Sequence, residues 1–137
     1  MRKVMFLDVD GVLNDLPRGG SPDIVGLYLG EMRSVVRELG LYVVISSGWR
    51  ENETKMDCLK RTLRSAGIRD FDVCRKGNKA SSVIGWLEEH RNEALKYVVV
   101  DDEESLAADF GDRLLVCRSG FDSQFSSVVR DAFNREP

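Results

Sequence analysis

The feature that most constrains this chain is an apolar run near the N-terminus that leads directly into two aspartates. Residues 4–7 are all apolar, and Asp8 and Asp10 follow with one valine between them and Gly11 behind them. A short apolar run that ends at a turn residue is typical of a strand buried on both faces of a parallel sheet. Side chains two positions apart on an extended chain point to the same side, so both carboxylates are expected together at the end of this strand.

Two neighbouring carboxylates repel each other unless a cation or a shared proton compensates their charge. Asp8 and Asp10 therefore predict a metal site. The same residues also suit an ordinary loop after a strand, because aspartate is common beside glycine in turns. Polar groups elsewhere in the chain are needed to decide between these two interpretations.

Composition indicates a soluble, globular chain of one domain, residues 1–137, with 42% hydrophobic and 31% charged residues. The formal net charge of -3 gives no general attraction to nucleic acid or to an anionic membrane, although 20 lysines and arginines leave room for a local basic patch. No apolar run approaches the roughly 20 residues that span a bilayer. Residues 1–3 lead straight into the first strand without the pattern of a signal peptide. We therefore expect a cytoplasmic protein with no membrane partner.

The number and spacing of the cysteines are also consistent with a cytoplasmic protein. Cys58, Cys74 and Cys117 are odd in number and have no Cys-x-x-Cys spacing. Such cysteines are typical of reduced, mostly structural thiols in an intracellular protein.

Apolar periodicity predicts strands that alternate with helices. Strands are expected at the N-terminal apolar run and at residues 41–45, 71–74, 96–100 and 114–117. Helices are expected at residues 27–39, 54–66, 80–91 and 122–134, with a short helical turn at 104–110. Their apolar faces are predicted to include Leu27, Ile84 and Val128. This alternation predicts a Rossmann-like, three-layer α/β/α sandwich with a five-stranded, mainly parallel sheet.

In such a sheet, ligands bind beyond the carboxyl ends of the strands. Ser46 and Ser47 follow the second predicted strand, and Asp101 and Asp102 follow the fourth. Lys79 opens the helix predicted at 80–91, and Lys76 is an alternative to it. Each feature also has an ordinary explanation, such as an acidic helix start for Asp101 and Asp102 or a solvated lysine for Lys79.

In this order the residues resemble the haloacid dehalogenase (HAD) superfamily of phosphohydrolases. Its four motifs are Asp-x-Asp after strand one, Ser or Thr at the end of strand two, a Lys before a later helix, and an acidic pair after strand four. The matching segments here are Phe-Leu-Asp-Val-Asp-Gly-Val-Leu-Asn, Val-Ile-Ser-Ser, Lys79 and Val-Val-Val-Asp-Asp. The resemblance spans residues 4–102.

The resemblance implies a role for each residue. Asp8 would be the nucleophile that forms an aspartyl-phosphate, and Asp10 the general acid and base. The Ser46 hydroxyl would hold phosphoryl oxygens, with Ser47 as the alternative, and Lys79 would balance negative charge. Mg²⁺ would be held by Asp8, the backbone carbonyl of Asp10, Asp101 and Asp102.

The segment Ser47-Gly48-Trp49-Arg50 also resembles small HAD domains found beside RNA-repair enzymes, which carry Ser-Trp-Arg at this place; the inserted Gly48 departs from that form. Because this segment follows a strand end, Ser46 to Arg50 are candidate substrate-binding residues, with simple packing as the alternative for Trp49 and Arg50. Trp86 is expected in the core or at its rim, and His90 on the solvated surface.

The spacing of the motifs leaves no room for the cap domain that many HAD enzymes carry. Only 35 residues separate Asp10 from Ser46, and 32 separate Ser46 from Lys79. An open site in this superfamily goes with large substrates such as polynucleotide ends. The sequence therefore predicts a capless, Mg²⁺-dependent phosphatase of polynucleotide or nucleotide phosphates.

Four alternatives follow from the same residues. The chain could act on a small metabolite or a phosphoprotein, or be a catalytically inactive HAD-like binding or regulatory module. A dehalogenase is disfavoured because it usually lacks an aspartate at the position of Asp10. A receiver domain is disfavoured because its acidic pair follows the first strand and its phosphoacceptor the third.

Overall fold

The structure is a computed structural model that describes residues 1–135. Five strands form one sheet in the order β3-β2-β1-β4-β5, and every pair of neighbours is parallel. The strands are β1 (Arg2–Leu7), β2 (Tyr42–Ile45), β3 (Phe71–Val73), β4 (Leu95–Asp101) and β5 (Leu114–Val116). The α-helices are α1 (Gly26–Leu39), α2 (Glu53–Ser65), α3 (Lys79–Glu89), α4 (Ala107–Phe110) and α5 (Ser123–Asn134). Short 3-10 helices are η1 (Leu16–Arg18), η2 (Gly48–Glu51), η3 (Glu104–Leu106) and η4 (Gly111–Arg113).

The first strand is the centre of the molecule. β1 pairs with β2 on one side and β4 on the other, and residues Val4 to Leu7 are fully buried. Met5 and Leu7 belong to one apolar core, and Val4 and Phe6 belong to a second core on the opposite face. The carboxyl end of β1 therefore opens at the middle of the sheet, between the ends of β2 and β4.

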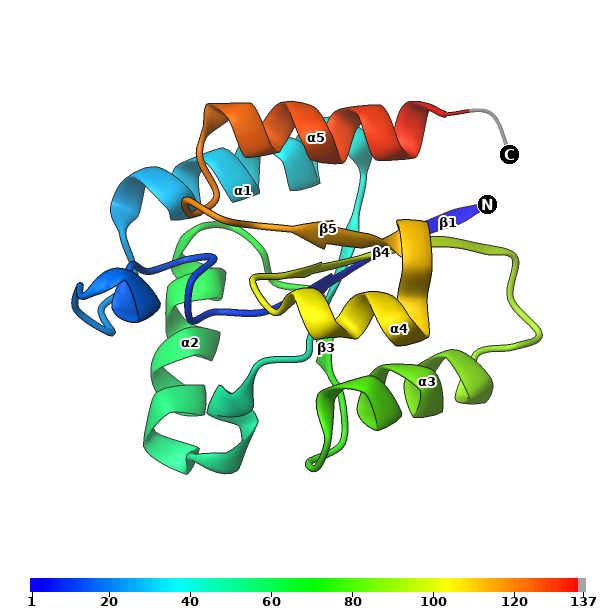
Figure 1. The fold of residues 1–137 in the computed structure, drawn as a ribbon, viewed down its shortest axis with the longest axis horizontal. Coiled ribbons are helices and arrows are strands. Elements are labelled where there is room, and N and C mark those ends of the chain that lie inside the picture. The colour runs from blue at the N-terminus through cyan, green and yellow to red at the C-terminus, as the bar shows by residue number, and fades with distance from the viewer. Residues whose placement is uncertain (136–137) are drawn as a thin grey trace.

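Helices cover both faces of the sheet, as Figure 1 shows. α1 and α5 lie side by side and pack with α2 on the face that contains Met5 and Leu7. α3 and α4 cover the other face through Val83, Trp86 and Phe110. This arrangement confirms the predicted three-layer α/β/α sandwich.

The predicted helices and strands agree with the structure to within two residues at their ends. Three apolar residues predicted to face the core do not: Leu27 is 66% exposed, Ile84 is 48% exposed and Val128 is 42% exposed. With about 100° of rotation per residue, these positions lie outside the arc of buried side chains on their helices. The buried face of each of these helices is therefore narrower than the face formed by all of its apolar residues.

The connections after β1 and β2 are short in the described part of the chain. The first contains only η1 and the second only η2 before the next α-helix begins. Neither contains a cap domain, as the motif spacing predicts.

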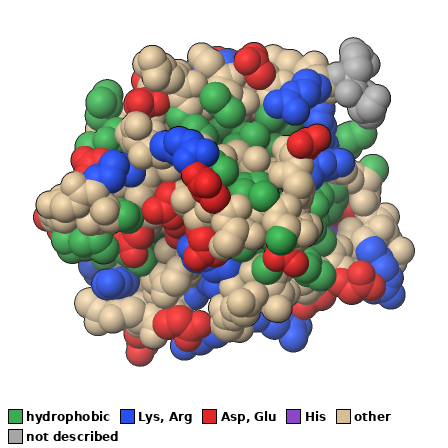
Figure 2. All heavy atoms as spheres, viewed as in Figure 1, with side chains coloured by type: hydrophobic (Ala, Val, Ile, Leu, Met, Phe, Trp, Pro, Cys, Tyr) green, Lys and Arg blue, Asp and Glu red, His purple; other side chains and the backbone are tan. Residues whose placement is uncertain are grey.

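Two features of the surface bear on possible partners. Among residues 1–135, no helix is both long enough and apolar enough to cross a membrane. On the face shown in Figure 2, acidic and basic side chains are interspersed. That face therefore has no broad patch of a single charge.

Candidate active site

Asp8 lies where β1 ends, at the middle of the sheet. Its backbone N–H donates to the carbonyl oxygen of Val100 at 3.0 Å, which continues the pairing of β1 with β4 beyond Leu7. The residue is 2% exposed, and its Oδ2 atom is buried without a hydrogen-bond partner among residues 1–135. An unpartnered charged oxygen is costly to bury, so this atom marks a place where a ligand is expected.

Asp101 and Asp102 bring two more carboxylates to the same place from the end of β4. Asp101 is fully buried, and its Oδ1 atom accepts a hydrogen bond from the Glu103 N–H at 3.0 Å. Asp8, Asp101 and Asp102 each offer a carboxylate oxygen within 4.8 Å of the others. The two acidic motifs predicted from the sequence therefore meet in space.

Gly11 makes this approach possible. Its φ of +83° is in the left-handed region, and a Cβ atom there would lie 2.2 Å from Oδ2 of Asp102. A larger residue would be strained in conformation and would also collide with the carboxylate. The glycine that follows Asp10 is thus required both for the turn and for the position of Asp102.

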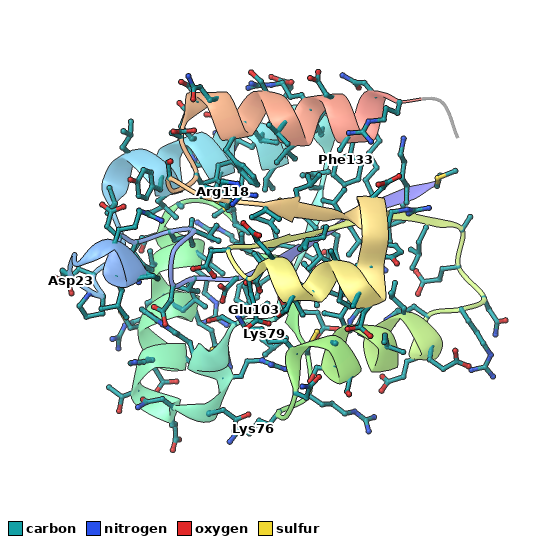
Figure 3. All side chains as sticks on the ribbon, in the orientation of Figure 1. Asp23, Lys76, Lys79, Glu103, Arg118 and Phe133 are labelled. Carbon is teal, nitrogen blue, oxygen red and sulfur yellow. The ribbon has the colours of Figure 1, made fainter. Side chains whose placement is uncertain are left out.

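Lys79, the first residue of α3, supplies the cation of the cluster. Its Nζ atom lies 3.1 Å from Oδ2 of Asp101 and 3.4 Å from Oδ2 of Asp8. The contact with Asp8 is an ion pair whose angles do not form a hydrogen bond. In Figure 3, Lys79 lies close to Glu103 near the strand ends, whereas the exposed Lys76 lies farther out in the preceding loop. Of the two candidate lysines, Lys79 is the one in the cluster.

One ammonium group does not neutralise three carboxylates. Burial, together with repulsion from Asp101, raises the pKa of Asp8 to about 8 against the opposing effect of Lys79. Burial and Asp101 also raise the pKa of Asp102. Burial favours the neutral form of Lys79, but attraction to Asp8 and Asp101 outweighs it and raises the pKa of Lys79. Negative charge at this site is therefore incompletely compensated by the protein.

The donor set fits Mg²⁺. This ion binds carboxylate and carbonyl oxygens and keeps several waters, so a few protein oxygens on one side suffice. The shortage of positive charge among Asp8, Asp101 and Asp102 is the condition that such an ion would relieve.

Asp10 is held in a different way from Asp8. Its Oδ1 atom accepts two hydrogen bonds, from Trp49 Nε1 at 2.9 Å and from Asn14 Nδ2 at 2.9 Å. Its carboxylate does not belong to the close group formed by Asp8, Asp101 and Asp102. Among the described residues, no hydrogen bond reaches Oδ2 of Asp10, so one oxygen is fixed and the other is available.

The two serines at the end of β2 also have different surroundings. The Ser47 hydroxyl caps η2 by accepting the Trp49 N–H at 3.1 Å. The Ser46 hydroxyl is buried and has no hydrogen-bond partner. Ser46 therefore has the hydroxyl that remains free to bind a ligand.

Trp49 and Arg50 are both buried, at 5% and 3% exposed. Arg50 donates from Nε to the Ser47 carbonyl at 2.7 Å, and from its other nitrogens to the carbonyls of Arg75 and Gly77. Its donors are thus used within the protein, and the contacts favour the packing alternative for Arg50. Gly48 is exposed at the start of η2, and a Cβ atom added there would meet no atom of the described residues within 4 Å.

Two further residues named from the sequence, Trp86 and His90, make no hydrogen bond to the clustered carboxylates among the described residues. Trp86 is buried on α3, as expected, and its Nε1 donates to Oδ2 of Asp72 at 2.8 Å. His90 is half-buried, because its ring stacks on Trp86 with the centroids 3.7 Å apart, so it is less solvated than the sequence indicated. The three cysteines are free, with Cys58 exposed.

No role for Asn14 in this site was predicted from the sequence. Asn14 is fully buried and accepts the Gly11 N–H at 3.0 Å while it donates to Asp10 and to the Pro22 carbonyl. Trp49 is predicted from the sequence as a substrate-binding or packing residue and not as a donor to Asp10. A signal was present for Trp49, because the single N–H of a buried tryptophan usually needs a partner.

Comparison with known proteins agrees with this geometry. None of the curated proteins compared with the chain matches it. Residues 4–124 match the family model described as the HAD domain in Swiss Army Knife RNA repair proteins. The match covers both acidic motifs, the serines of β2 and Lys79, which the fold brings to one place. The chain therefore belongs to the family of HAD domains of Swiss Army Knife RNA repair proteins.

Proposed function

We propose that this protein is a Mg²⁺-dependent phosphatase that hydrolyses phosphomonoesters of nucleic-acid ends or nucleotides through an aspartyl-phosphate on Asp8. The observation that carries the proposal is the buried Oδ2 of Asp8, which has no hydrogen-bond partner and lies 3.4 Å from the Lys79 ammonium. A carboxylate oxygen kept free of donors and beside a fixed cation is suited to attack phosphorus.

In the first step, an Asp8 oxygen forms a bond to phosphorus and the bond from phosphorus to the leaving oxygen breaks. Asp10 gives its proton to that oxygen, so an alcohol departs. In the second step, water attacks the phosphorus of the aspartyl-phosphate and Asp10 takes the water's proton. Asp8 is released together with inorganic phosphate.

The surrounding residues support these steps. The free hydroxyl of Ser46 donates to a phosphoryl oxygen, and Lys79 balances charge on the phosphoryl group. Trp49 and Asn14 hold Oδ1 of Asp10, so that Oδ2 carries the proton. Asp8, the backbone carbonyl of Asp10, Asp101 and Asp102 would hold Mg²⁺. The bound ion would supply positive charge that lets an anionic carboxylate approach an anionic phosphate.

The family and the open site support the substrate class. The matched family is described by its occurrence in RNA repair proteins, and repair of nucleic acid requires ends with defined phosphorylation. No cap domain covers the strand ends in the described residues, so a large substrate can reach Asp8.

Beryllium fluoride tests the proposal directly. With Mg²⁺ present, we expect a fluoroberyllate adduct on Asp8, visible by crystallography and by ¹⁹F NMR, and no adduct on the Asp8→Asn variant. Hydrolysis of 3'- and 5'-phosphorylated oligonucleotides, phosphorylated metabolites and phosphopeptides is measured in parallel. An empty site at saturating Mg²⁺, with no turnover of any substrate, would identify the chain as a non-catalytic binding module.

A further inference from the structure

A groove of about 450 Å³ lies beside Trp49, between the loop that follows β1 and the first half of α2. Its walls include Pro22, Asp23, Ile24, Leu29, Trp49, Lys55 and Cys58. Most of these side chains are apolar. The groove has the size of a small-molecule site and is open at the surface.

The groove is joined to Asp10 through two of its walls. Trp49 donates its indole N–H to Oδ1 of Asp10 at 2.9 Å. The carbonyl of Pro22 accepts from Asn14 Nδ2 at 2.9 Å, and the same nitrogen donates to Oδ1 of Asp10 at 2.9 Å. Both walls are therefore connected to the carboxylate by short chains of hydrogen bonds. The groove therefore borders the residue that protonates the leaving oxygen in the proposed mechanism.

The residues that line the groove favour one kind of leaving group over others. Ile24, Leu29 and Trp49 offer an apolar surface, which suits the face of a flat ring. Lys55 adds one exposed cation, with its Nζ atom 5.6 Å from the centroid of the Trp49 ring. An aromatic ring next to an anion satisfies both features. A nucleoside followed by a phosphodiester has this composition.

We infer that this groove binds the terminal nucleoside of a phosphorylated nucleic-acid end, with Lys55 on the adjoining phosphodiester. The inference rests on the proposed function, because that function identifies the leaving-group side. It goes further by assigning substrate selection to residues on the 22–29 segment and α2. A 3'-phosphate and a 5'-phosphate end share this chemistry, and the experiment below separates them.

The native protein contains a reporter for occupancy of the groove. Cys58 is an exposed thiol on the groove wall, whereas Cys74 and Cys117 are buried. Burial raises the pKa of both Cys74 and Cys117 to about 12, so their thiols remain protonated and react slowly with an aromatic disulfide reagent. The rate of thiol modification in the folded protein therefore reports access to Cys58.

The binding test uses a dinucleoside monophosphate, which has no terminal phosphate and is not a substrate. We expect millimolar dinucleoside monophosphate to slow the modification of Cys58 at least threefold, and orthophosphate alone to leave the rate unchanged. Unchanged modification at saturating dinucleoside monophosphate would overturn the inference, as would equal protection by a peptide of similar size. This measurement does not depend on turnover, so it fails or succeeds separately from the proposed function.

The kinetic test uses one variant that fills the groove and one that removes its cation. We expect Cys58→Trp to lower the ratio of kcat/KM for a phosphorylated oligonucleotide to that for p-nitrophenyl phosphate about tenfold or more. We expect Lys55→Ala to lower this ratio about threefold and to weaken its salt dependence. Lys60→Ala is the matched control on α2, because Lys60 lines a different hollow, and it should leave the ratio unchanged.

Comparing oligonucleotides with 3'- and 5'-phosphates shows which end the groove accepts. A ratio that stays at the native value in both Cys58→Trp and Lys55→Ala would overturn the inference while leaving the phosphatase activity established. Absence of hydrolysis of every phosphate by the native protein would instead count against the proposed function.

Discussion

Asp8 and Asp10 are two residues apart, yet their surroundings differ in kind. Asp8 is buried among Asp101, Asp102 and Lys79, and its Oδ2 atom has no hydrogen-bond donor. Asp10 is half-buried and has neutral N–H donors from Trp49 and Asn14 on one oxygen. The first region is organised by charge and remains short of positive charge, whereas the second is organised by hydrogen bonds. In the proposed mechanism, the carboxylate that attacks is kept free of donors, and the carboxylate that exchanges a proton is held in a fixed orientation.

The largest expected effect comes from removing Asp8, the proposed nucleophile of the charged region. We expect Asp8→Asn to lower kcat for p-nitrophenyl phosphate by about 10³-fold or more, because the amide cannot form the covalent intermediate. Circular dichroism should show an unchanged fold, and the exposed Asp112→Asn is the matched control. Native turnover in Asp8→Asn would refute the covalent mechanism.

Removing the cation of the same region comes next. We expect Lys79→Met to lower kcat about 10²-fold, because Lys79 is the fixed positive charge 3.4 Å from Asp8. Lys76→Met changes the same residue type in the exposed loop before α3 and should stay within about twofold of the native kcat, as expected for an exposed side chain outside the site. Steady-state kinetics of both variants decide the matter, and equal losses would contradict the assignment of Lys79.

The hydrogen-bonded region should respond in a way that depends on the leaving group. We expect Trp49→Phe to lower kcat for an alkyl phosphate about tenfold, because a poor leaving group needs the proton that Asp10 donates. The loss should be smaller for p-nitrophenyl phosphate, whose leaving group is good. Trp86→Phe is the control, since that indole N–H donates to Asp72 on β3 and not to Asp10. The same loss with both substrates would show that Trp49 acts through general packing.

The smallest effect concerns stability against pH. In metal-free protein the pKa of Asp8 is about 8 when folded, above its ordinary 3.8, so the folded chain holds this proton more tightly than the unfolded chain. The resulting stability is fully present below pH 3.8 and is lost as the pH rises through about 8. In EDTA, we expect Tm to fall further between pH 5 and pH 8.5 for the native protein than for Asp8→Asn.

The effect of added Mg²⁺ on Tm gives a second test of the titration of Asp8. Because the ion competes with the proton on Asp8, added Mg²⁺ should raise Tm more at pH 8 than at pH 5. Parallel curves for native protein and Asp8→Asn, with and without Mg²⁺, would show that Asp8 is not the group that titrates.

Much of the fold and of the charged region could be predicted from sequence because their signals are local. The apolar run before Asp8, the periodicity of the helices and the polar residue after each strand all lie within short segments. Parallel strands then bring Asp8, Ser46 and Asp101 together without further information. The position of Lys79 followed from its place at the start of α3.

The hydrogen-bonded region could not be predicted in the same way because its contacts are distant in the sequence or depend on exact direction. Trp49 and Asp10 are 39 positions apart, and nothing local to either indicates that the indole N–H faces the carboxylate. The short helix η2, which directs Trp49 inward, depends on the Ser47 cap and on Arg50 bonding to residues 75–77. Leu27, Ile84 and Val128 were misplaced for a related reason, since periodicity gives a face and not its width.

Arg50 has a consequence for how the protein meets its substrate. By bonding the carbonyls of Ser47, Arg75 and Gly77, its guanidinium ties the serine segment after β2 to the loop that leads to Lys79. These two segments are therefore ordered when the chain folds, and substrate binding does not have to restrict their motion. Under the proposed function, we expect that the entropy of ordering them does not reduce the affinity for substrate.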